Sequence, residues 1–262
     1  MAPLSLRGKI AAAEVAFWVP PAIFTLVLVI RYAFRKDAGW FFLFIFSLTR
    51  ITAGALGIVI DTNTSPSMQS DMFLAEIILF SAGLALLFLS AIGFLGLAGQ
   101  HQYSEYRQMS RYFRGFAIFP IIAMAFCIAG NILGSHVSPD SANAGLILRR
   151  IAAGIYGATY LLLFLLAGKC WTYRYYLKRH RKRLLAGTTF GLLFLGVRVA
   201  YAILDAWSAS DQFGIALSSD PTLAQFNSIS GDYIPYLVMG LVMEYLTALT
   251  FLLSSTVIMQ RR

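Results

Sequence analysis

The stretch MFLAEIILFSAGLALLFLSAIGFLGL, Met72–Leu97, contains a single charged side chain, Glu76. A run of about 18 or more apolar residues is long enough to cross the hydrocarbon core of a bilayer as a helix. Comparable runs recur along the whole chain, and they are continuous rather than alternating, which favours helices over a β-barrel. The sequence therefore predicts an all-α, polytopic membrane protein.

The composition agrees with this fold class. Of the 262 residues, 58% are hydrophobic and 13% are charged, whereas a soluble domain carries about 25% charged residues. Because the chain has no long polar segment, we expect one membrane domain, 1–262, that is integral and multi-pass, in the plasma membrane or an endomembrane. The apolar runs and their polar breaks predict a bundle of seven transmembrane helices at about residues 11–30, 40–60, 72–97, 115–133, 148–168, 185–207 and 233–258.

Basic residues gather in every second connection between the predicted spans. The connections 31–39, 98–114 and 169–184 hold most of the 21 lysines and arginines, whereas the opposite connections hold aspartates. Under the positive-inside rule the N-terminus lies outside and the C-terminus is cytosolic. The net charge of +9 then reflects topology, and we expect no nucleic-acid partner. The basic run Tyr173–Arg183 is expected to meet anionic lipid headgroups, with a cytosolic partner as the alternative.

Three ionisable residues fall near the middle of predicted spans, at one depth by the 1.5 Å rise of a helix. Arg50 and Arg198 lie in the second and sixth spans, and Glu244 lies in the seventh. Charged side chains at this depth are costly and mark either a functional site or a static ion-pair network. Because two cations face one anion, we expect either another carboxylate or an anionic ligand group to supply the missing negative charge.

Helical phase places further polar and aromatic side chains on the same inward faces. Arg198, Tyr201 and Asp205 share one face of their span, for example. The sequence thus predicts a pocket in the outer half of the bundle for a small lipophilic or anionic-headed molecule. The candidate ligand-binding residues are Arg50, Arg198, Tyr201, Glu244, Glu14, Glu76, Tyr160, Asp205 and Asn131.

Several functions remain open from the residues. A sensor-like or accessory role is one, a membrane-embedded enzyme with Glu244 as catalytic acid is a second, and a lipid or small-molecule translocator is a third. The last span has no lysine for a Schiff base, and the three histidines lack metal-ligand spacing, so we expect neither metal nor cofactor. Asn63 begins a glycosylation sequon in a connection predicted to face the lumen.

Short motifs carry a resemblance to a known family. They are AEVAFWVPPAIFTLVLVIRYAFRKDAGWFFLFIFSLTRI (Ala13–Ile51), LFLSAIGFLGL (Leu87–Leu97), VRVAYAIL (Val197–Leu204) and VMEYL (Val242–Leu246). The chain resembles a family of fungal seven-helix integral membrane proteins described only as a domain of unknown function. The resemblance implies that Arg50, Arg198 and Glu244 are family features. It also implies a fungal source, in which such genes can neighbour clusters for natural-product (secondary) metabolism.

Overall fold

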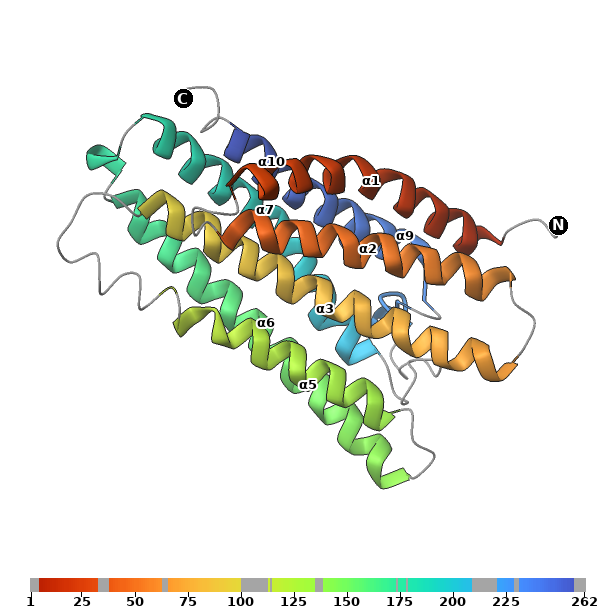
Figure 1. Cartoon of the computed structure of the whole chain (residues 1–262). Coiled ribbons are helices and arrows are strands. Elements are labelled where there is room, and N and C mark those ends of the chain that lie inside the picture. Colours follow the sequence, from red (N-terminus) through yellow and green to blue (C-terminus); the bar gives the residue numbers. More distant parts are fainter. Residues whose placement is uncertain are drawn as a thin grey trace.

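The chain folds as a bundle of long helices (Figure 1), and no strand occurs among the residues that the structure describes. The structure is a computed structural model, which describes residues 5–32, 38–62, 66–99, 113, 115–134, 139–172, 174–177, 179–208, 221–228 and 231–256. Its elements are α1 (Leu6–Tyr32), α2 (Ala38–Thr62), α3 (Pro66–Gly99), α5 (Ile118–Gly134), α6 (Pro139–Thr172), η2 (Arg174–Tyr176), α7 (Arg179–Ser208), α8 (Pro221–Ala224), α9 (Tyr233–Pro235), η3 (Tyr236–Val242) and α10 (Met243–Thr256).

Six of the described helical segments are long and apolar enough to cross a membrane. They correspond to the first, second, third, fifth, sixth and seventh predicted spans, and they fit a multi-pass membrane protein. The fourth predicted span, 115–133, corresponds to α5, which has 17 residues. This helix is shorter than a typical spanning helix, so a seventh crossing stays a prediction. Helices α1, α2, α3, α6 and α7 extend beyond the predicted spans at both ends.

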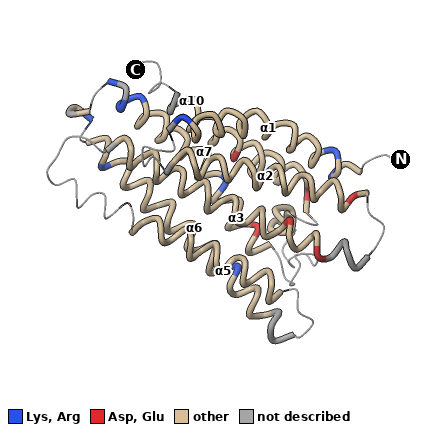
Figure 2. Tube along the Cα trace, in the orientation of Figure 1, with Lys and Arg blue, Asp and Glu red and all other residues tan. Residues whose placement is uncertain are grey.

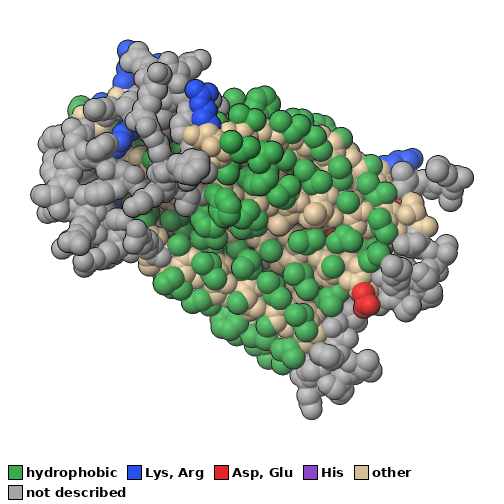
Figure 3. All heavy atoms as spheres, in the orientation of Figure 1, with side chains coloured by type: hydrophobic (Ala, Val, Ile, Leu, Met, Phe, Trp, Pro, Cys, Tyr) green, Lys and Arg blue, Asp and Glu red, His purple; other side chains and the backbone are tan. Residues whose placement is uncertain are grey.

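Helix α3 lies at the centre of the bundle, where it packs against α2, α5 and α7. Its buried side chains cover more than one face, which is typical of a helix surrounded by others. By contrast, α1, α5 and α6 keep large apolar side chains exposed on one side. Figure 3 shows hydrophobic side chains covering the middle of the molecule. These faces are the surfaces that a bilayer would cover.

Glycines allow several helix pairs to approach closely. A Cβ at Gly145 of α6 would lie 2.7 Å from the carbonyl oxygen of Gly130 in α5, and one at Gly187 of α7 would lie 2.2 Å from Cβ of Ser254 in α10. Likewise, a Cβ at Gly54 of α2 would lie 2.8 Å from Cγ2 of Val15 in α1. Such small residues are typical of interfaces between membrane helices, where backbones must come close together. Gly54 and Gly57 of α2 therefore lie at the contact with α1.

The two ends of the bundle differ in charge. Figure 2 shows Lys and Arg gathered mainly at one end and Asp and Glu toward the end at which α1 begins. We call these the basic end and the acidic end. The basic end includes Arg174, whose guanidinium lies 5.5 Å from the ring centroids of both Trp171 and Tyr175. The asymmetry is the one from which the orientation was predicted, while the orientation itself stays a prediction.

The seventh predicted span is a continuous but irregular helix. It begins as α9 at Tyr233, passes through the π-helix η3 over Tyr236–Val242, and continues as α10. π-Helical turns are rare and are found frequently at functional sites, because they change which side chains face a neighbour. Here the π-helix ends two residues before Glu244, the only acidic residue of α10.

Candidate ligand-binding site

Four charged side chains from four helices form a chain of ion pairs in the interior, which we call the ionic cluster. Arg198 of α7 donates from Nε to Oε1 of Glu244 in α10. The other oxygen of Glu244, Oε2, pairs with Nη2 of Arg50 in α2. Nη1 of Arg50 in turn lies 3.5 Å from Oε1 of Glu14 in α1. The cluster thus joins α7, α10, α2 and α1 at one depth.

The ionic cluster is almost fully buried. The exposed fraction is 1% for Arg50, 2% for Arg198 and 0% for Glu244. Phe80 of the central helix α3 contacts both arginines, since its ring centroid lies 4.4 Å from Cζ of Arg50 and 4.7 Å from Cζ of Arg198. Cation–π contacts of this kind add to the stabilisation when the cation is desolvated. All five helices α1, α2, α3, α7 and α10 therefore contribute to one centre.

Glu14 supplies the second anion that the sequence required. Among the described residues, two arginines now face two carboxylates, so the cluster is neutral without a ligand. A buried pair in which every charge has a partner avoids the several kcal/mol that an unpaired buried ion costs. The ionic cluster by itself accordingly has the properties of a structural network.

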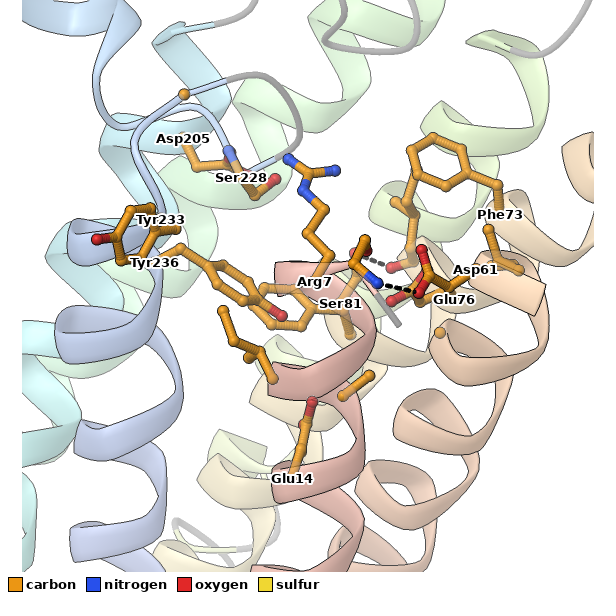
Figure 4. A pocket seen from close by; sticks show the side chains of 18 of the residues that line it. Arg7, Glu14, Asp61, Phe73, Glu76, Ser81, Asp205, Ser228, Tyr233 and Tyr236 are labelled. Carbon is orange, nitrogen blue, oxygen red and sulfur yellow. Dashed lines mark hydrogen bonds between the residues drawn. The ribbon is translucent and has the colours of Figure 1, made fainter. Parts of the chain in front are cut away.

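A cavity of about 310 Å³ lies between the ionic cluster and the acidic end. Figure 4 shows the Glu14 side chain reaching up from α1 into this space, with Tyr236 on one side and Glu76 and Asp61 on the other. The walls come from α1, α2, α3, α6, α7, α9, η3 and the turn before α9. The lining residues are Ser5, Arg7, Ile10, Ala11, Glu14, Gly57, Ile60, Asp61, Phe73, Glu76, Ile77, Phe80, Ser81, Arg149, Asp205, Ser228, Gly231, Asp232, Tyr233 and Tyr236.

Two of the lining carboxylates are fixed by backbone donors. Asp61 accepts a hydrogen bond of 2.8 Å from the backbone N–H of Ser5, just before α1. Asp205 accepts one of 2.8 Å from the backbone N–H of Ser228, and its other oxygen lies 3.9 Å from Nη2 of Arg149. These contacts tie the start of α1 and the turn before α9 to the bundle, so they hold the rim of the cavity in place.

The described part of the segment before α9, residues 221–228 and 231–232, forms part of the cavity wall. Its fold is compact, because Gly231 donates to the carbonyl of Asn227 and Asp232 donates to that of Gln225. A Cβ at Gly231 would lie 2.5 Å from the Asn227 carbonyl oxygen and 2.8 Å from that of Ala224, so this position requires glycine. The connection between α7 and α9 runs over residues 209–232 and includes α8. Its described part borders the cavity, while residues 209–220 lie outside the described residues.

Comparison with known proteins places the chain in a family. Residues 4–261 match the model of a family described as Domain of unknown function (DUF7702). The chain belongs to this family. A search of curated proteins found no match, and a search of solved structures found none. The match covers nearly the whole chain, so the expected membership in a family of unknown function is confirmed.

The predicted site residues of this family member fall into three groups. Glu14, Glu76 and Asp205 line the cavity. Arg50, Arg198 and Glu244 lie beneath it in the ionic cluster, and the buried Tyr201 ring lies 5.7 Å from Cζ of Arg198. The remaining two are placed elsewhere among the helices: Asn131 is buried in α5, and Tyr160 of α6 packs with its hydroxyl against Gly196. Their roles in binding stay predictions.

Sequence reasoning missed several lining residues. Arg7 lies seven residues before Glu14 and hence on the same face of α1, a signal that the spacing offered. Asp61 shares a stripe with Arg50 on α2 in the same way. Ser228 and Asp232 carry no comparable signal, because their position depends on how an irregular connection folds back. The sequon at Asn63 lies outside the described residues, as does the side chain of each histidine.

Proposed function

We propose that this protein binds a small amphipathic molecule in the cavity at the acidic end, in a sensor-like or accessory role. The observation that carries the proposal is the cavity itself, whose volume of about 310 Å³ falls at the lower end of the range for small-molecule sites. Its walls combine carboxylates and hydroxyls with the rings of Phe73, Phe80 and Tyr236. This combination suits a molecule with one polar group and one apolar body.

Glu14 supports the sensor-like role. Its side chain lines the cavity and also pairs with Arg50 of the ionic cluster. A molecule that binds to Glu14 would compete with Arg50 for this carboxylate. Because Arg50 also pairs with Glu244, occupancy of the cavity would change the forces between α1, α2 and α10. A ligand that interacts differently with two arrangements of helices shifts the balance between them.

The enzymatic alternative receives less support from the geometry. Glu244, the candidate catalytic acid, does not line the described cavity, and both of its oxygens face arginine side chains. A general acid must come within hydrogen-bond reach of the group that it protonates. A substrate in this cavity would first meet Glu14 or Glu76 instead. For these reasons we propose a binding function rather than an enzymatic one.

Equilibrium binding to the purified protein in lipid nanodiscs tests the proposal. The probes are three molecules with the same naphthyl body: 2-(naphthalen-1-yl)ethylamine, 2-(naphthalen-1-yl)ethanol and naphthalen-1-ylacetate. Ile77 lines the cavity, so Ile77→Trp should fill it and abolish saturable binding. Ile151→Trp is the matched control, because Ile151 lies 45% exposed on the apolar face of α6. If no probe shows binding that Ile77→Trp removes and Ile151→Trp keeps, the proposed site is wrong.

A further inference from the structure

The charges of the cavity wall indicate what kind of polar group the ligand carries. We propose that the cavity selects an organic cation, an amine or quaternary ammonium attached to an apolar body. This inference rests on the binding function proposed above and specifies its ligand. It also reverses the expectation of an anionic-headed ligand that the two midplane arginines raised.

Carboxylates outnumber guanidinium groups around the cavity. Two arginines line it, Arg7 and Arg149, and Arg149 lies 3.9 Å from Asp205. The lining carboxylates are Glu14, Asp61, Glu76, Asp205 and Asp232. Glu14 balances Arg50 in the ionic cluster beneath. The other four lining carboxylates still outnumber the two lining arginines. The described surroundings of the cavity therefore carry net negative charge.

The neighbouring connections do not offset this charge. The segments that join consecutive helices at the acidic end include 63–65, 135–138 and 209–220, and none of these three contains a lysine or an arginine. Two further aspartates, Asp211 and Asp220, lie in the last of these segments. A cavity with walls of low dielectric and a surplus of one sign of charge concentrates ions of the opposite sign.

Glu14 provides a buried acceptor at the floor of the cavity. Its side chain is 7% exposed, and its Oε1 accepts no hydrogen bond from any described residue. The nearest cationic nitrogen, Nη1 of Arg50, lies 3.5 Å away, beyond the usual length of a charge-assisted hydrogen bond. In Figure 4 the carboxylate points into the cavity. It is thus available to accept a hydrogen bond from a ligand N–H group.

Glu76 and the aromatic rings complete the recognition of a cation. Glu76 makes no ion pair within 4.0 Å to a described residue. Its Oε1 lies close to Gly57, since a Cβ at Gly57 would lie 3.2 Å from this oxygen. The Tyr236 ring stacks on Phe80 with centroids 5.7 Å apart. Carboxylates combined with aromatic faces are a recurrent arrangement for binding amines and quaternary ammonium groups.

A metal ion is a poor match for the same walls. Among the described residues no three His, Cys, Asp or Glu side chains converge closely enough to hold a metal ion. The cavity of about 310 Å³ is also far larger than the roughly 30 Å³ of liquid that one water molecule occupies. The separated carboxylates and the available volume fit a cation with a body of its own.

The three naphthyl probes test the sign of the charge at constant shape. We expect the amine to bind about tenfold more tightly than the alcohol, since a partly buried carboxylate contributes about this factor, and the carboxylate probe to bind most weakly. Glu76→Gln should weaken binding of the amine about fivefold or more and weaken binding of the alcohol by a clearly smaller factor. Asp71→Asn is the matched control, because Asp71 lies exposed near the start of α3 but does not line the cavity.

The outcomes separate the two proposals. If the alcohol or the carboxylate probe binds at least as tightly as the amine, and Ile77→Trp removes that binding, the cavity is a binding site but the inferred charge is wrong. If Asp71→Asn weakens amine binding as much as Glu76→Gln does, the selectivity comes from the general surface charge, which also overturns the inference. If none of the probes binds in a manner sensitive to Ile77→Trp, both proposals fall together.

Discussion

Glu14 and Arg50 join the cavity to the ionic cluster, with Oε1 of Glu14 lying 3.5 Å from Nη1 of Arg50. Without Glu14 the cluster would consist of two arginines around one carboxylate. With it, the charges balance, and the same carboxylate forms the floor of the cavity. One residue near the start of the chain thus serves both the internal pairing of the helices and the candidate binding site.

Glu244→Gln should destabilise the protein more than any other single removal of a carboxylate. Glu244 is fully buried and faces both Arg50 and Arg198, so its loss leaves two guanidiniums with one anion. Removing one partner of a buried ion pair costs about 3–5 kcal/mol. Thermal unfolding in nanodiscs should show the loss as a large decrease in Tm.

A second variant distinguishes pairing from a general requirement for Glu244. In Arg198→Met combined with Glu244→Gln, the remaining Arg50 and Glu14 form a balanced pair. We expect this double variant to recover at least half of the lost Tm, because no uncompensated charge stays buried. An effect of the two changes that is simply additive would show that Arg198 and Glu244 do not act as a pair.

Glu14→Gln and Glu76→Gln should differ in their effect on stability. Glu14 pairs with the buried Arg50, whereas Glu76 has no ion pair among the described residues. We therefore expect Glu14→Gln to lower both Tm and affinity for the naphthyl amine, and Glu76→Gln to lower the affinity alone. Equal decreases in Tm for the two variants would contradict the role assigned to Glu14.

The glycines at helix contacts should tolerate no methyl group. A Cβ at Gly187 would lie 2.2 Å from Cβ of Ser254, whereas a Cβ at Gly154 would meet nothing within 4 Å. Gly187→Ala should therefore destabilise the protein by about 1–3 kcal/mol through overpacking. Gly154→Ala should be neutral or slightly stabilising, because alanine is the better helix former by about 1 kcal/mol. Unfolding temperatures of the two variants compare these effects directly.

The orientation of the chain can be tested at Asn63. If the acidic end faces the lumen, expression in a eukaryotic host should attach a glycan at this sequon. The glycan should shift the electrophoretic mobility, and both glycosidase treatment and Asn63→Gln should remove the shift. A glycan that instead appears on a sequon introduced into the connection 169–184, at the basic end, would reverse the predicted orientation.

Continuous apolar runs and helical phase were sufficient to predict the helices and the midplane cluster. Arg50, Arg198 and Glu244 meet because each lies about ten residues from the same end of its helix, a distance that the 1.5 Å rise converts directly into depth. The pairing of Glu244 with both arginines follows from that depth. The choice of Glu14 over Glu76 as the second anion does not, because it depends on which helices are neighbours.

The cavity could be predicted only in part. The polar residues in the acidic half of the bundle predicted at which level it lies. Its walls also include Ser228, Gly231 and Asp232 from the connection before α9, whose path no periodic pattern indicates. The π-helix over Tyr236–Val242 was equally hidden, since the apolar run reads as an ordinary helix. The sequence left two sources for the missing negative charge, another carboxylate or an anionic ligand group, because the neighbours of Arg50 could not be known from it. From the residues around the cavity itself we propose a cationic ligand.

The reaction of a single cysteine in the cavity tests the central claim most directly, because it requires no knowledge of the ligand. Ile77→Cys is introduced together with Cys127→Ala and Cys170→Ala. The rates at which this cysteine reacts with two methanethiosulfonates are then compared, one with a trimethylammonium group and one with a sulfonate group. Thr62→Cys is the reference, since Thr62 is exposed at the same end but does not line the cavity. We predict that Ile77→Cys reacts, and that its preference for the cationic reagent is about tenfold greater than at the reference. An unreactive cysteine, or one that shows no greater preference for the cation than the reference does, would contradict a cation-binding cavity at this end of the bundle.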